Sequence, residues 1–240
     1  MSFLDYRRLD ALDAKAFQQT KPYAWMNPGG LLTDDGYRRL VETLPDFSIF
    51  EPSFGVQRSH GQQPHDRYIL EYDESLPVSD DWHAFARELR EDRYKSFVRR
   101  MFGRGFLRLS YHWHYTPKGC SISPHCDAKR KLGSHIFYFN TEQEWKPEWG
   151  GQTLVLDDHG RFPRKSAPKI EDFDSVTAAD AMGNYSFLFA RGDKSWHGMQ
   201  EIRCPEGAFR KVFIVVVEDW ARGLKRSIKM RLRGERAASY

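Results

Sequence analysis

The sequence predicts a mainly β fold of the α+β class, a double-stranded β-helix related to the jelly roll with supporting helices packed outside it. Short segments of alternating apolar and polar residues, bounded by turn residues, fill the second half of the chain. Helix-like segments precede them. Seven or eight such strands suit a closed two-layer barrel. The expected strands are 106–115, 123–128, 134–140, 152–157, 186–191, 195–201 and 209–218.

Two helical segments are expected before the strands. Thr33 begins the first as an N-cap, the apolar residues that follow recur at helical spacing, and Pro45 ends it. Ser79 begins the second. The apolar side of this second segment consists of Trp82, Phe85, Leu89, Phe97, Val98 and Met101. Residues 66–72 are typical of a strand, and we expect the helices to cover one face of a sheet.

A single domain, 1–240, is expected. The chain has 240 residues, of which 40% are hydrophobic and 15% aromatic, which indicates a packed globular protein rather than a disordered one. No Gly/Ser linker, low-complexity tract or repeat interrupts it. We expect a support region at 1–105, the β-helix core at 106–220, and a basic helix or tail at 221–240.

The cysteines and the apolar runs limit the class of protein. The three cysteines cannot all pair with one another and show no C-x-x-C spacing, so neither a disulfide framework nor a zinc knuckle is expected. The longest apolar run covers only 212–217, and residues 1–20 are rich in charge. We therefore expect a cytoplasmic protein without a membrane span or a signal peptide.

Positive charge is concentrated at the C-terminal end. Residues 221–240 contain seven Lys and Arg against one Glu, whereas the whole chain has a formal net charge of +4. Leu224, Ile228 and Leu232 recur every four residues, which indicates a helix with one apolar stripe. Two interpretations stay open: a solvated helix face, or a contact surface for a polyanion such as RNA, a ribosome, a membrane or a glycan phosphate.

Three residues form a candidate metal site. His125 and Asp127 are two positions apart, so on a β-strand both side chains leave the same face. His197 follows the apolar run 186–190, and the turn 191–193 between them predicts a hairpin. Two histidines and one carboxylate can hold ferrous iron on one octahedral face and leave the opposite positions open.

Arg210 is the second candidate. It stands at the start of the apolar strand 212–217, and a cation there needs an anionic partner, because a buried unpaired charge costs several kcal/mol. A dicarboxylate ligand would provide this partner.

The order H-x-D, distal His, then Arg resembles the iron(II)- and 2-oxoglutarate-dependent oxygenases, nearest to the prolyl-hydroxylase type. Three further stretches agree: 115–117, 136–140 and the Gly-Gly turn at 150–154. The resemblance covers about 106–219, roughly half of the chain. This sequence departs from the family pattern in the extra residues 204–207 and in the long segment between Asp158 and Ser186.

The resemblance implies a mechanism and further site residues. His125, Asp127 and His197 would bind Fe(II), and Arg210, Tyr115 and Tyr138 would bind 2-oxoglutarate. Dioxygen would be the other co-substrate, with ascorbate as an optional support, and the products would be succinate, carbon dioxide and a hydroxylated C–H bond. Related halogenases have a small residue in place of the carboxylate ligand, so Asp127 favours hydroxylation.

The substrate is left open by the sequence. The prolyl-hydroxylase-like spacing favours a peptidyl or amino-acid side chain, so the partner would be a protein, a peptide or a small molecule. A sugar or glycan, a lipid and a small metabolite are the alternatives, and a non-catalytic cupin-like protein that binds a metal or ligand is another. The segment 160–184 is long enough to act as a lid or a substrate-binding loop.

The remaining histidines and tryptophans are expected to be structural. If Tyr115 faces the barrel interior, alternation puts His112 and His114 on the opposite face. His135 should stand on the face opposite to Tyr138, and Cys126 should pack rather than react. Residues expected to lie without partners at metal-ligand spacing are His60, His65, His83 and His159. Tryptophans near the expected site mouth, each more typical of a core, are Trp145, Trp149 and Trp196.

Overall fold

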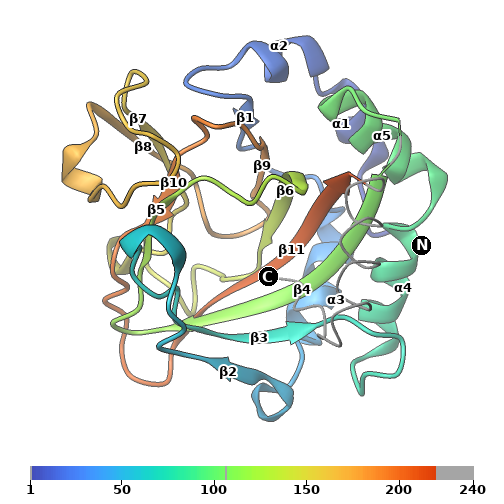
Figure 1. Ribbon diagram of the computed structural model, residues 1–240. Coiled ribbons are helices and arrows are strands. Elements are labelled where there is room, and N and C mark those ends of the chain that lie inside the picture. The colour runs from blue at the N-terminus through green and yellow to red at the C-terminus, as the bar shows by residue number, and fades with distance from the viewer. Residues whose placement is uncertain (1, 106, 220–240) are drawn as a thin grey trace, which may run out of the picture.

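Two antiparallel sheets form the body of the protein in the computed structural model, which describes residues 2–105 and 107–219 (Figure 1). The larger sheet has the order β1 (Trp25–Met26), β9 (Ser186–Ala190), β6 (Lys131–Tyr138), β11 (Phe209–Asp219), β4 (Leu107–Pro117), β3 (Arg67–Glu71) and β2 (Glu51–Ser53). The smaller has the order β5 (Ile122–His125), β10 (His197–Met199), β7 (Leu154–Asp157) and β8 (Ser175–Ala178). The predicted double-stranded β-helix is confirmed.

The long pair β4–β11 is the centre of the larger sheet. Its register runs from Leu107 opposite Asp219 to Pro117 opposite Phe209. On its other edge β11 pairs with β6, with Tyr138 opposite Val212. Because side chains alternate along a strand, this register decides which residues of β4 share a face with Arg210.

Within residues 2–105, five α-helices lie along one side of the larger sheet, at the right and top of Figure 1. They are α1 (Tyr6–Ala11), α2 (Ala14–Gln19), α3 (Asp34–Glu42), α4 (Asp80–Glu88) and α5 (Asp92–Phe102). The predicted N-caps are confirmed: Thr33 Oγ1 accepts from the Gly36 amide at 3.0 Å, and Ser79 Oγ from the Trp82 amide at 3.3 Å. Short 3-10 turns lie at Phe47–Ile49, Ser59–Gly61, Pro147–Trp149 and Ile170–Asp172.

The second predicted helical segment is two helices. The backbone of Glu91 is extended, with φ −71° and ψ 156°, which ends α4 and lets α5 start in a new direction. α5 then ends at Gly103, whose left-handed φ of 61° glycine adopts without strain. The break allows the apolar residues of both helices to reach the same core.

The main apolar core lies between these helices and the larger sheet. Trp82 of α4 packs against Trp113 of β4, with ring centroids 4.9 Å apart, and against Phe213 of β11 at 5.2 Å. All three are fully buried. Tyr111 and Tyr115 belong to the same cluster. The odd-numbered residues of β4 from 111 to 115 therefore face the helices, and the even-numbered ones face the space between the two sheets.

Several elements were not predicted. α1, α2, β1 and β2 are short, and β8 lies inside the segment 160–184, where all four of its residues are exposed. An exposed edge strand has no buried face and thus no apolar alternation that would reveal it. No helix within 2–105 or 107–219 is long and apolar enough to cross a membrane. The predicted basic helix at 221–240 lies outside the described residues.

Candidate metal centre

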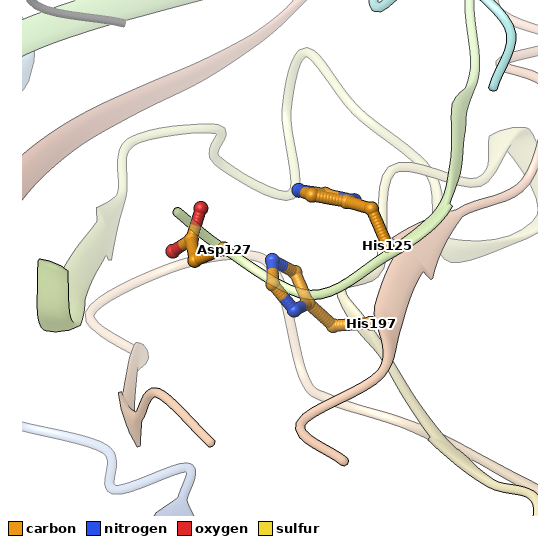
Figure 2. Close-up of side chains that lie close together, drawn as sticks. All are labelled: His125, Asp127 and His197. Atoms are coloured by element: carbon orange, nitrogen blue, oxygen red, sulfur yellow. The ribbon is translucent and has the colours of Figure 1, made fainter. Parts of the chain in front are cut away.

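His125, Asp127 and His197 converge between the sheets. His125 is the last residue of β5 and is paired directly with His197, the first residue of β10. Asp127 follows two residues after His125, and all three side chains point into one space (Figure 2). One ligand-type atom from each residue lies within 4.8 Å of the other two. This spacing suits a single metal ion.

Backbone carbonyls orient the two imidazoles. The Nδ1 of His125 lies 3.0 Å from the carbonyl oxygen of Ser123, and the Nδ1 of His197 lies 2.9 Å from that of Ser195. Since a carbonyl oxygen only accepts, each Nδ1 must carry the proton and donate. Each Nε2 is then left with its lone pair, the form that binds a metal.

The charge states also suit a metal. Burial, together with the neighbouring His197 and His65, holds the pKa of His125 well below its usual value, and burial also lowers the pKa of His197. Burial alone would raise the pKa of Asp127. The Lys131 ammonium, which lies 3.0 Å from Oδ1 of Asp127, and His197 both lower this pKa, and their combined effect is larger than that of burial. Two neutral imidazoles and one carboxylate result at neutral pH.

Arg210 lies in the wall of the same cavity, which has a volume of about 200 Å³. Its side chain is 4% exposed; Nε donates to the Gly151 carbonyl at 2.5 Å, and Nη2 to Thr153 Oγ1 at 3.3 Å. Within the described part of the chain no carboxylate forms an ion pair with it. A buried cation next to an open cavity and without a protein counter-ion is a site for an anionic ligand.

Tyr138 adjoins Arg210. Its ring centroid lies 5.4 Å from the guanidinium carbon, and its hydroxyl is 2.7 Å from Thr153 Oγ1. Thr153 thus contacts both residues. Tyr138 is completely buried, which keeps the phenol protonated: burial raises its pKa more than the nearby Arg210 lowers it.

Tyr115 does not reach this site. It stacks on Phe50 with ring centroids 4.2 Å apart, and its hydroxyl donates to the Pro45 carbonyl at 3.4 Å, on the helix-covered face of the sheet. In the β4–β11 register Thr116, not Tyr115, stands opposite Arg210. The structure therefore brings together five of the six residues that the sequence singled out and places the sixth on the other face.

The same alternation reverses the prediction for two histidines. His112 and His114 line the cavity, with ring centroids 4.6 Å apart, so placing them on the face opposite to the barrel interior was wrong. His135 does lie opposite to Tyr138, on the helix side, where its Nδ1 is 2.9 Å from the hydroxyl of Tyr94. Cys126 packs against Leu156 and Trp196 in an apolar cluster, as expected.

Sequence reasoning missed the residues that arrive from a loop. His65 lies 4.5 Å from His125 between ring centroids, and its Nε2 is 3.1 Å from Ser123 Oγ. Arg58, from the same loop, lines this cavity, and so does Arg67, the first residue of β3. The segment from 54 to 66 has no strand or helix periodicity that would have predicted where the side chains of Arg58 and His65 lie.

Comparisons with known proteins agree with this geometry at the level of the fold. No protein-family model matches the sequence, and no curated protein sequence matches it. Among solved structures, a prolyl-4-hydroxylase from Pseudomonas putida superposes with a TM-score of 0.59 at 16% identity, over 85% of this chain and 97% of that one. A prolyl hydroxylase from Trichoplax adhaerens, in complex with a peptide fragment of hypoxia-inducible factor, has a TM-score of 0.60 at 15% identity, over 91% and 93%.

A third similar structure carries ligands. HygX from Streptomyces hygroscopicus, with nickel and 2-oxoglutarate bound, has a TM-score of 0.57 at 14% identity and covers 88% of each chain. At these identities the likeness establishes the fold. What the chain does must be argued from its own residues.

Proposed function

We propose that this protein is an Fe(II)- and 2-oxoglutarate-dependent dioxygenase that hydroxylates a C–H bond of its substrate. One observation carries the proposal. The three candidate metal-ligating side chains line the same cavity as Arg210, which is buried and forms no ion pair with a carboxylate of the described residues. A metal site alone suits many proteins. A metal site facing a buried guanidinium suits a chelating ligand with a second carboxylate, and 2-oxoglutarate is such a ligand.

The residues around the cavity fit both Fe(II) and 2-oxoglutarate. His125 and His197 would offer their Nε2 atoms to Fe(II), and Asp127 would offer a carboxylate oxygen while Lys131 holds its Oδ1. Arg210 would bind the distal carboxylate of 2-oxoglutarate, with Thr153 and Tyr138 beside it as hydroxyl groups. Fe(II) and 2-oxoglutarate, once bound, would react with dioxygen, with one oxygen atom going into succinate as carbon dioxide leaves and the other into the C–H bond as a hydroxyl group.

The surrounding residues would orient the reactants and exclude water. The carbonyls of Ser123 and Ser195 fix the two imidazole rings, so that binding a metal requires little rearrangement. Apolar side chains that line the cavity are Ile122, Ile136, Phe189, Met199, Ile214 and Val216. These groups offer no acceptor or donor, so polar interactions at the centre are stronger than in water.

A peptidyl or amino-acid side chain is the leading candidate substrate. The Trichoplax neighbour, which is similar in fold, is in complex with a peptide, and two of the neighbours named above are prolyl hydroxylases. A sugar or glycan, a lipid or a small metabolite are the alternatives, because this fold accepts many substrates.

The test uses the uncoupled reaction, which needs no substrate. Protein loaded with Fe(II) and 2-oxoglutarate without oxygen should release succinate and carbon dioxide when air is admitted. The Asp127→Ala protein should release far less, and the exposed-carboxylate control Asp34→Ala should match the wild type. If wild-type protein holds iron but forms no succinate above the iron-free background, the enzyme proposal fails.

A further inference from the structure

The cavity holds more positive charge than the proposed reaction uses. Its lining includes the cations Arg58, Arg67, Lys131 and Arg210, but Asp127 is the only carboxylate among the described residues that line it. Lys131 forms an ion pair with Asp127, and Arg210 would bind the co-substrate. Arg58 has no role in either task.

Two further histidines in the lining do not change this balance. Burial lowers the pKa of His112 to about 3. Burial likewise holds the pKa of His114 well below its usual value. Both are therefore neutral at physiological pH and add no charge to the cavity.

Loading the site does not remove the excess either. This step rests on the proposed function: the two positive charges of Fe(II) and the two negative charges of 2-oxoglutarate cancel one another. A loaded cavity thus stays positive, and apolar side chains such as Ile136, Phe189 and Ile214 form part of its wall. Unbalanced charge in such surroundings favours an anion as the next ligand.

Arg58 stands next to the metal ligands. It lines the same cavity as His125, Asp127 and His197. Its Nε is buried without a hydrogen-bond partner, and it forms no ion pair with any carboxylate of the described chain. A buried guanidinium nitrogen without an acceptor costs stability unless a ligand provides one.

The loop that carries Arg58 is held in place over the cavity. The Gln62 side-chain amide donates to the Ser166 carbonyl at 3.1 Å, and His65 contacts Ser123 Oγ of β5 at 3.1 Å. Arg67, where β3 begins, donates from Nη1 to the His65 carbonyl at 2.7 Å. Arg58 is thus presented by a loop anchored at both the segment 160–174 and the smaller sheet.

We infer that the hydroxylated substrate carries an anionic group, a carboxylate or a phosphate, which Arg58 binds beside the metal centre. The guanidinium fork suits both groups, since each offers two oxygens in one plane. The reacting carbon would then lie close to this anion, which makes Arg58 a specificity-determining residue. An acidic side chain, the carboxylate of a free amino acid and a phosphorylated metabolite all meet this requirement.

The first stage of the test separates this inference from the proposed function. Wild-type, Arg58→Gln, Arg58→Lys and the exposed control Arg7→Gln are loaded with Zn(II), and 2-oxoglutarate binding is measured by calorimetry. All four should bind 2-oxoglutarate with similar affinity, which also shows that each is folded. Failure of the wild type to bind it would overturn the proposed function, whereas a loss of more than tenfold in Arg58→Gln alone would overturn only the role given to Arg58.

The second stage probes the anion site in the Zn(II)- and 2-oxoglutarate-saturated proteins by saturation-transfer NMR. The probes are acetate for a carboxylate, methyl phosphate for a phosphate, and acetamide as the neutral control. Acetate or methyl phosphate should bind the wild type and Arg7→Gln, and binding should weaken by roughly tenfold or more in Arg58→Gln. The stronger of the two anions indicates the substrate group.

Arg58→Lys should retain part of the binding, because it keeps the charge and loses the fork. Equal anion binding by wild type and Arg58→Gln would overturn the inference. So would equal binding of acetamide and acetate by the wild type, because the cavity would then not select for charge.

Discussion

The two faces of the larger sheet are built from the same strands, but one face packs against the helices and the other lines the cavity. On the helix side, β4 presents Tyr111, Trp113 and Tyr115 to a dry aromatic core. On the other side the same strand presents His112 and His114 to the cavity that contains the candidate metal ligands. Alternation of side chains along one strand therefore separates the residues that stabilise the fold from those that form the site.

This separation means that substitutions on the two faces should have different consequences. A change on the helix side should alter the free energy of unfolding and leave ligand affinity intact. A change in one of the proposed ligand-binding residues on the cavity side should lower ligand affinity and leave the free energy of unfolding nearly unchanged. The predictions that follow test this contrast, from the largest expected effect to the smallest.

Trp113→Ala should lower the free energy of unfolding by about 3–5 kcal/mol, the usual cost of removing a fully buried large aromatic side chain. Zn(II) affinity of the folded protein should stay within about threefold of wild type. The neighbour His114→Ala, on the cavity side, should cost much less stability. Chemical denaturation measures both variants, and comparable losses in the two would contradict the division between faces.

His197→Ala should lower metal affinity by about 100-fold or more, since even residues that only support metal ligands contribute 10–100-fold. Its free energy of unfolding without metal should change little. The matched control is His112→Ala, which lies in the same cavity but outside the ligand set. Anaerobic calorimetry with Fe(II) or Zn(II) measures this, and an equal loss in both variants would show that the metal binds elsewhere.

Arg210→Met should weaken 2-oxoglutarate binding roughly 10- to 150-fold, corresponding to about 1.5–3 kcal/mol for a charge-assisted hydrogen-bonded pair. Metal affinity should be retained. Thr153→Val should have a smaller effect in the same direction, because it removes one neutral hydroxyl group beside Arg210 and Tyr138. An unchanged 2-oxoglutarate dissociation constant in Arg210→Met would mean that another cation binds the distal carboxylate.

His135→Phe should make the free energy of unfolding depend less on pH in the acidic range. Burial on the helix side lowers the pKa of His135 to about 3, so between about pH 6.5 and pH 3 the unfolded chain binds a proton that the folded one does not. The stability that the neutral imidazole contributes is therefore present above about pH 6.5 and is lost as the pH falls toward 3. Denaturation at pH 6.5, 5.5 and 4.5 should show a slope smaller by about 1.4 kcal/mol per pH unit in the variant. Parallel profiles would contradict the burial of a neutral histidine there.

The sequence singled out the candidate metal ligands and Arg210, which the structure places around one cavity, because local spacing in the sequence indicates them. His125 and Asp127 are two residues apart, so their side chains lie on the same face of a strand. Arg210 is a cation at the start of an apolar strand, which indicated an anionic partner. The structure adds the pairing of His125 with His197, which only the register of β5 and β10 determines. The strands of both sheets were largely predicted because they are apolar and bounded by turns.

What could not be predicted depends on long-range register and on loops. Alternation showed that Tyr115 and His114 face opposite ways but not which of them faces the cavity, since that depends on the pairing of Thr116 with Arg210. Arg58 and His65 reach the site from a loop whose path is set by contacts with Ser123 and Ser166. Such contacts leave no periodic signal in the sequence.

The most direct measurement of the central claim is an anaerobic titration of the Fe(II)-loaded protein with 2-oxoglutarate, followed by visible absorption. A weak charge-transfer band should develop and saturate with one iron per chain, and admission of air should remove it with formation of succinate. His197→Ala should give no band, and Arg210→Met should give it only at much higher 2-oxoglutarate concentration. A wild-type protein that holds iron at this site yet shows neither the band nor succinate would contradict the account.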